Sequence, residues 1–160
     1  MREAIGGTWL FGLVITFIVF FASFLAVSIN YSKAFNVKNN VVDLISKYEG
    51  NNPCARKHIE SYLRTTGYLV SGRCPEIDPS TKKCLYTGYN SDGTEVTNTT
   101  TKTYYWIRND MTDNTSNLEK KFYRVVIFFR IDLPMVGDIA TFRINGETES
   151  IPFANEKNSC

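Results

Sequence analysis

The sequence predicts an α+β protein in which a long N-terminal helix, with a transmembrane half and an amphipathic half, packs on a small antiparallel β-sheet stapled by disulfides. Three observations predict this architecture. An uncharged apolar run opens the chain, a helical period continues directly from it, and the remainder combines strand-like segments with four cysteines. The 160 residues therefore divide into a transmembrane helix (1–29), its amphipathic continuation (30–50) and one small extracytoplasmic α+β domain (51–160).

The opening run, Ala4–Ile29, contains no charged side chain. At ~1.5 Å per residue, a helix of this length reaches about 40 Å, which exceeds the ~30 Å hydrocarbon core of a bilayer. The core helix of a soluble domain is one alternative, but the rest of the chain is too small to enclose it. A cleavable signal peptide is the other, with Arg2 as a basic start and Ala26–Ser28 as a cleavage site. Because signal h-regions usually span only ~7–15 residues, we expect a retained membrane anchor.

Small residues recur at helical spacing within this run. Thr8, Gly12 and Thr16 follow one another every four residues and share one helix face, and Ala22 and Ala26 repeat the spacing further along. Such faces let two helix backbones approach closely inside a bilayer. The alternative is that small residues are simply common in membrane helices. We interpret these five residues as a helix-packing face.

The helical period continues beyond the membrane run without a stop signal, and Gly50 is placed to end the helix in a left-handed cap. Polar and charged residues occupy one side of this segment, which makes it amphipathic and in need of an apolar partner outside the membrane. The apolar stripe consists of Tyr31, Ala34, Phe35, Val41, Val42, Ile45 and Tyr48.

A short second helix is predicted after the first one. Asn52 followed by Pro53 is typical of a helix start, with Asn as the cap and Pro at the first helical position, and Gly67 closes the segment. His58 lies on this helix among charged neighbours. We interpret it as a solvated histidine rather than a ligand or a catalytic base.

Strands are predicted from residue 67 onward, where the period changes. Expected strands lie at 67–74, 84–89, 103–109 and 121–134, with a last strand pair in 139–152, and the Thr-rich segment 94–102 is an exposed loop or edge strand. The strongest strand, 121–134, should bury one face made of Tyr123, Val125, Ile127, Phe129 and Ile131, while its other face is partly polar.

A two-residue turn is predicted within the last strand pair. Asn145-Gly146 is the dipeptide typical of such a hairpin, and Arg143 would face Glu147 across it. The stripe of the long helix and the buried face of the 121–134 strand each need a cover, so we expect them to pack on each other.

All four cysteines, Cys54, Cys74, Cys84 and Cys160, follow the apolar run. An even number in a small domain behind a membrane segment indicates two disulfides in an oxidising compartment, hence an extracytoplasmic domain at the cell surface. Sequence alone leaves the three possible connectivities open, although a bridge across the 74–84 loop is geometrically easy and would leave the other two cysteines for each other. A zinc site is the alternative, but the chain has no CxxC pair and a single histidine.

The sequence contains no catalytic constellation: no GxSxG, no HExxH, no phosphate-binding loop and one histidine. The formal net charge of +2 is too small to indicate a nucleic-acid surface. Residues 108–117 resemble a calcium loop only loosely, because the glycine is missing and the ligand positions do not align. We therefore expect a non-enzyme without metal, cofactor or nucleic-acid partner.

A hydrophobic N-terminal helix that continues into the segment NYSKAFNVKNNVVDLISKYEG, followed by a disulfide-bonded sheet, resembles type IV pilins and pseudopilins. It resembles most closely the TadE-like small pilins of bacterial tight-adherence systems. The resemblance covers about the first 50 residues and is one of layout beyond them. It implies a bacterial membrane subunit whose partners are other pilin-like subunits or assembly-machinery proteins.

Processed pilins carry a glutamate at the fifth mature position. Cleavage after Gly6 or Gly7 would leave Phe11 or Gly12 there, so the resemblance implies a minor, priming or assembly-associated subunit rather than a major filament subunit. We expect a single-pass, membrane-anchored, pilin-like minor subunit of a surface appendage or secretion complex. The alternative is a monomeric membrane-anchored extracellular binding or sensor domain.

Overall fold

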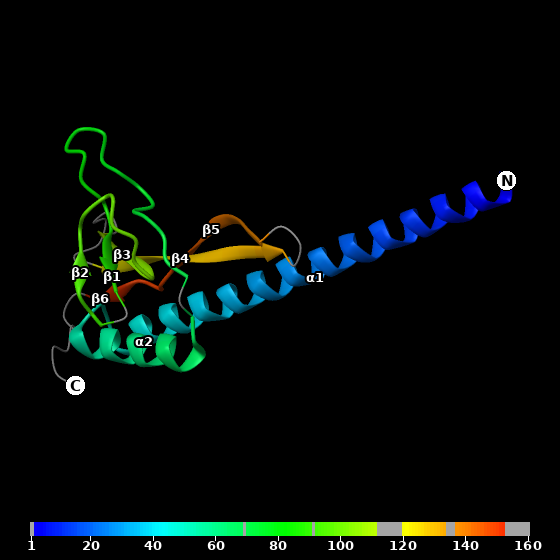
Figure 1. Cartoon of the computed structure of the whole chain (residues 1–160). Coiled ribbons are helices and arrows are strands. Elements are labelled where there is room, and N and C mark those ends of the chain that lie inside the picture. Colours follow the sequence, from blue (N-terminus) through cyan, green and yellow to red (C-terminus); the bar gives the residue numbers. More distant parts are fainter. Residues whose placement is uncertain (1, 69, 91, 112–119, 134–136, 153–160) are drawn as a thin grey trace.

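The structure is a computed structural model that describes residues 2–68, 70–90, 92–111, 120–133 and 137–152. It has the predicted α+β class, with one very long helix and an antiparallel sheet (Figure 1). The elements are α1 (Arg2–Lys47), α2 (Pro53–Thr66), β1 (Thr87–Tyr89), β2 (Glu95–Val96), β3 (Tyr105–Met111), β4 (Lys120–Leu133), β5 (Gly137–Glu147) and β6 (Ile151–Pro152).

Helix α1 runs without a break through 46 residues, about 70 Å at ~1.5 Å per residue. Its second half lies along β4 and β5, whereas its first half projects alone from the rest of the molecule (Figure 1). Within residues 7–47 the helix is long and apolar enough to cross a membrane, and its most apolar stretch is not buried by the chain itself. A membrane anchor and a signal sequence both have this property.

The sheet is antiparallel with strand order β2-β1-β3-β4-β5, and β6 pairs with the start of β4. Because β6 and β5 lie on the same edge of β4, they are two parts of one interrupted edge strand. Thr148 bridges the interruption. Its N–H donates to the Tyr123 carbonyl over 3.0 Å, and its Oγ1 accepts from the Tyr123 N–H over 2.9 Å, so the ladder stays hydrogen-bonded between the two parts.

Both faces of the sheet are covered. On one face, α1 and α2 pack on a core that includes Ile59, Tyr105 and Ile127. On the other, a smaller core lies under the segment that precedes β1, and its buried members are Tyr86, Trp106, Val126 and Phe128. The expected helix-facing side of β4 is confirmed for Tyr123, Val125 and Ile127, which are buried there, with Phe129 partly buried. The opposite face is partly polar as expected, with Arg124 and Arg130 half-buried, but Val126 and Phe128 between them are buried in the second core, which was not expected.

The predicted limits of α2 are confirmed. Asn52 caps its start by accepting the Ala55 N–H at Oδ1 over 2.8 Å, and Gly67 ends it in the left-handed region at φ 63°. The predicted cap of α1 is wrong by one residue. Glu49 takes the left-handed conformation (φ 55°), and the N–H of Gly50 donates to the Ile45 carbonyl over 2.9 Å. The turn closes as a Schellman motif with a glutamate at the position usually held by glycine.

The predicted turn at Asn145-Gly146 is wrong, because β5 runs straight through both residues. Gly146 instead lies where α1 crosses the sheet: a Cβ there would be 2.8 Å from a Lys38 side-chain carbon and 3.0 Å from one of Val42. The glycine permits close approach of the helix rather than a reversal of the chain. The expected pair of Arg143 with Glu147 is also wrong, since both side chains have other partners, described below.

The predicted strand at 67–74 is reduced to one isolated bridge between Gly72 and Thr103. Tyr68 faces the core with its hydroxyl donating to the Phe128 carbonyl, and burial raises the pKa of this phenol. Gly72 lies against the Phe128 ring so closely that a Cβ would overlap it. The segment therefore serves as a cover over the second core rather than as a strand of the sheet.

Candidate functional site

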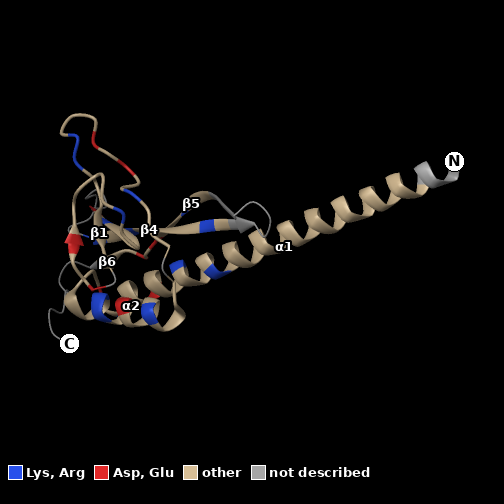
Figure 2. Ribbon diagram, in the orientation of Figure 1, with Lys and Arg blue, Asp and Glu red and all other residues tan. Residues whose placement is uncertain are grey.

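The first half of α1 is the largest exposed apolar surface among the described residues. Figure 2 shows no Lys, Arg, Asp or Glu on it between the grey first residues and the region where the helix meets the sheet. Between residues 7 and 29, thirteen large apolar side chains are exposed, Trp9 and Phe20 most strongly. Transfer of so many partly exposed side chains out of water is worth on the order of 20 kcal/mol, so this half requires a bilayer or protein partners around it.

Three hydroxyl groups of this half donate hydrogen bonds within the helix. Thr16 donates to the Gly12 carbonyl over 2.9 Å, Ser23 donates to the Val19 carbonyl over 2.8 Å, and Ser28 donates to that of Phe24 over 2.9 Å. A polar group left without a partner in hydrocarbon costs several kcal/mol. Because each hydroxyl bonds one turn back, these residues can face lipid or another helix at little desolvation cost.

Thr8, Gly12 and Thr16 lie together on one face of α1. With Trp9, Leu13, Phe17 and Phe20 they line a shallow hollow on the helix surface. A Cβ at Gly12 would meet nothing within 4 Å among the described residues, so packing within that part of the chain does not require the glycine. Glycine in a helix interior costs about 1 kcal/mol relative to alanine. The helix backbone is therefore accessible on this face.

The second predicted pair of small residues is split. Ala26, half-buried, follows Gly12 by about four turns and shares its face, whereas Ala22, exposed, lies about a quarter of a turn away. Ser23 follows Gly12 by about three turns and therefore belongs to the same face. Sequence reasoning missed Ser23 because it does not continue a four-residue spacing from Thr16. A helical-wheel projection at 100° per residue includes it.

The amphipathic stripe divides into a buried and an open part. Ala34, Val41 and Ile45 are fully buried against the sheet, and Val37, which the prediction omitted, is buried with them. Val37 is three residues after Ala34 and four before Val41, so strict helical spacing identifies it. Of the remaining stripe residues, Val42 and Tyr48 are half-buried, and Tyr31 and Phe35 are exposed.

His58, predicted to be solvated, is exposed and its ring stacks on that of Tyr48 at 5.0 Å between centroids. The described residues contain no group of three His, Cys, Asp or Glu side chains that could hold a metal ion. Most of the loosely calcium-like segment, 112–117, lies outside the described residues.

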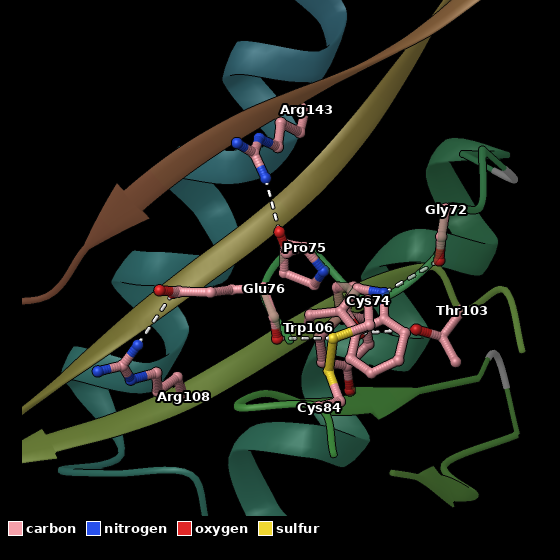
Figure 3. Close-up of a disulfide and its surroundings, with 10 residues drawn as sticks. Gly72, Cys74, Pro75, Glu76, Cys84, Thr103, Trp106, Arg108 and Arg143 are labelled. Atoms are coloured by element: carbon pink, nitrogen blue, oxygen red, sulfur yellow. Dashed lines mark hydrogen bonds and ion pairs between the residues drawn. A yellow bond between two sulfur atoms is a disulfide. The ribbon is translucent and has the colours of Figure 1, made fainter. Parts of the chain in front are cut away.

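The cysteines form a staple on the far side of the sheet from α1. Cys74 and Cys84 are disulfide-bonded with their Cα atoms 5.9 Å apart, and they lie next to Trp106 (Figure 3). The Trp106 indole N–H donates to the Gly72 carbonyl over 3.0 Å. Cys54 is also disulfide-bonded, and Cys160 lies outside the described residues.

Charged groups attach the disulfide loop to the sheet. Glu76 accepts from Arg108 over 3.0 Å, and Arg143 donates to the Pro75 carbonyl over 2.7 Å (Figure 3). Glu147, which the sequence predicts as the partner of Arg143, instead accepts a hydrogen bond from Arg124 Nε over 2.8 Å. These contacts are partly exposed, so each adds little stability, but together they fix the loop's position.

Asp78 organises the tip of the disulfide loop. Its carboxylate accepts hydrogen bonds from the hydroxyls of Ser80 and Thr81, each over 2.7 Å, and from the Ser80 N–H over 2.9 Å. These donors lower the pKa of Asp78 to about 2, and the Ser80 hydroxyl makes the largest contribution. The charge stays on an exposed turn with no acid–base partner described beside it, so its role is local structure.

The chain matches no protein-family model, no curated protein and no solved structure. The likeness to TadE-like pilins therefore stays a prediction from the sequence.

Proposed function

We propose that the chain is a single-pass, membrane-anchored, pilin-like minor subunit that acts by assembly into a surface appendage or secretion complex. The observation that carries the proposal is the continuity of α1. One unbroken helix presents a bare apolar half and a half that forms the core of a folded domain. Such a helix couples packing inside the bilayer directly to the position of the domain outside it.

The disulfides support an extracytoplasmic location for the domain. Cys54, Cys74 and Cys84 are all bonded, and disulfides persist mainly in oxidising compartments. The domain follows α1 in the chain, so the N-terminal end of α1 would lie on the cytoplasmic side.

The face around Gly12 supports assembly over a monomeric anchor. A glycine that no contact among the described residues requires, flanked by two threonines one turn away, suits close approach of a second helix. In lipid, such packing acts through van der Waals contacts and not through exclusion of water. A monomeric binding or sensor domain would need only an apolar surface at these positions.

Site-specific photocrosslinking in membranes tests the proposal. A photoreactive amino acid is placed at Thr16, on the small-residue face, and separately at Ile18, which is at nearly the same depth but about 200° around the helix. Assembly through the face predicts dimers and higher multimers from position 16 and several-fold fewer from position 18. Equal yields at both positions, or monomers only, would favour the monomeric binding or sensor domain and refute this interface.

A further inference from the structure

Four aromatic rings form a row at the end of the domain where α1 leaves the sheet. Ring centroids are 6.3 Å apart for Phe35 and Tyr31, 5.7 Å for Tyr31 and Phe129, and 5.3 Å for Phe129 and Phe142. The row thus crosses from α1 over β4 to β5. Three of its members are exposed, Tyr31 by 49%, Phe142 by 46% and Phe35 by 40%, and Phe129 is half-buried.

The exposure is concentrated in this row. Beyond Ile29, the described residues include five exposed large apolar side chains, and three of them belong to the row; the other two are Ile77 and Leu85. Single exposed apolar residues are normal on a protein surface, whereas contiguous ones mark interaction sites. The row is contiguous, so we expect a binding partner to cover it.

The row lies at the level of the bilayer surface if α1 is the anchor, and this step rests on the proposed function. Trp9 and Tyr31 are about 33 Å apart along α1 at ~1.5 Å per residue, which matches a hydrocarbon core of ~30 Å with an aromatic residue at each boundary. The apolar span from Gly7 to Ile29 is slightly longer than the core, so it is long enough to cross with some tilt. A tilt toward the sheet would lower Phe142 onto the headgroups.

Basic side chains lie beside the row on both faces of the sheet. On the row's side, Lys33 and Arg130 line a hollow of about 100 Å³ beside Phe129. On the face away from α1, Arg73, Lys102 and Arg143 line a hollow of about 460 Å³ that also touches Phe128 and Cys74 of the second core. Of the described residues that line the two hollows, none is acidic.

Lysine and arginine near a membrane surface are attracted to anionic lipids, and aromatic rings settle at the headgroup level. The combination of both at one edge of the domain, directly above the membrane span, selects a lipid surface over a second protein. A protein partner would need carboxylates placed opposite each of these cations. Anionic phospholipids supply negative charge along the whole membrane surface, so no such placement is needed.

We propose that this membrane-proximal surface, made of the aromatic row and the cations of the two hollows, binds anionic phospholipid headgroups of the bilayer that α1 crosses. The rings enter the interfacial layer and the cations contact the phosphates. The contact fixes the tilt and rotation of α1, and with them the direction in which its small-residue face points.

Tryptophan quenching by lipids brominated near the headgroup tests the proposal on the full chain in vesicles. The reporter is Phe142→Trp in a Trp9→Phe background, with the fully buried Trp106 as a constant signal. The matched control is Ile77→Trp in the same background, since Ile77 is exposed to a similar degree (50%) but lies on the disulfide loop. Vesicles contain phosphatidylcholine with or without phosphatidylglycerol. Native Trp9 in the unmodified chain reports insertion of α1.

We expect strong quenching at position 142 when phosphatidylglycerol is present and little at position 77. Replacing Arg73 and Lys102 by Gln should weaken the contact roughly fivefold per charge, whereas Lys82→Gln/Lys83→Gln on the disulfide loop should not change it. Folding of each variant is checked by the near-ultraviolet circular dichroism of Trp106.

Quenching of Trp9 without quenching at 142 would overturn the headgroup contact and leave the anchor intact. Equal quenching with and without phosphatidylglycerol would overturn the assignment to anionic lipids. A blue-shifted but unquenched signal at 142 would mean that protein, such as a second copy, covers the row. Absence of Trp9 quenching would instead refute the anchor on which this inference rests.

Discussion

Ile45→Ala tests whether the outer half of α1 is part of the core of the domain. Ile45 is 0% exposed and packs in the main core between α1 and the sheet. The substitution removes three buried carbon groups at ~0.8 kcal/mol each, and the cavity left behind raises the total to about 3–4 kcal/mol. The matched control is Ile29→Ala in the same helix, because Ile29 is 66% exposed in the chain. Both variants gain the same helix propensity, so their difference isolates burial.

Unfolding is followed in detergent micelles by the fluorescence and near-ultraviolet circular dichroism of Trp106, which is fully buried in the second core. We expect the Ile45 variant to melt roughly 10 °C lower than the unmodified chain and the Ile29 variant to melt within about 2 °C of it. If the two variants lost equal stability, or if Ile45→Ala cost less than ~0.5 kcal/mol, the division of α1 into an exposed apolar half and a half that belongs to the core would be wrong.

Two further predictions concern the disulfide loop. Replacing Cys74 and Cys84 by Ser opens a loop with a sequence separation of 10 and should lower the free energy of unfolding in urea by about 2–3 kcal/mol; an unchanged midpoint would show that the Trp106 contacts suffice. Because hydrogen bonds lower the pKa of Asp78 to about 2, its stabilising charge is fully present above the ordinary pKa of about 3.9 and is lost only as the pH falls through about 2. Ser80→Ala should raise the midpoint of the Asp78 carboxyl in an NMR titration toward the ordinary value, and an unmoved midpoint would contradict that role.

Local chemistry made the helices predictable. The uncharged run and the apolar period that follows it require no knowledge of the rest of the fold, and they predict a continuous α1. The start and end of α2 follow from one capping side chain, Asn52, and one left-handed glycine, Gly67, both acting within a few residues of the helix. The buried face of β4, with Tyr123, Val125 and Ile127, could also be predicted, because the alternation of side chains is visible within that one segment.

Tertiary contacts decided the features that the sequence did not predict. Asn145-Gly146 has the composition of a turn, but a helix some hundred residues earlier in the chain packs on Gly146, and no local pattern contains that information. The second core around Trp106 and Phe128 forms only because the segment from Val70 to Cys84 folds back over the sheet. Arginines flank these apolar residues along β4, so the sequence predicts a partly polar face and not a second core.

Only part of the candidate site could be predicted from the sequence, because only part of it lies within one element. Thr8, Gly12 and Thr16 were found from spacing alone, since they lie on one helix. The aromatic row was not, because Tyr31, Phe129 and Phe142 come from three different elements and meet only when α1 lies across β4. Tyr31 was assigned to the buried stripe, and the structure instead leaves it open at the end of the domain.

The continuity of α1 restricts how two subunits can pack. Val41, on the sheet-facing side, follows Gly12 by about eight full turns, so the small-residue face in the membrane half and the sheet lie on the same side of the helix. Helices in contact are about 8–10 Å apart, and the sheet packs directly on this side of α1. Two subunits paired nearly parallel through this face at equal height would therefore place each helix in the volume of the other's sheet. A crossing angle between the two helices removes the overlap, because the halves that carry the sheets then diverge from a contact centred on Gly12. Two subunits that meet through this face should therefore cross rather than run parallel, and the contact should be confined to the residues around Gly12.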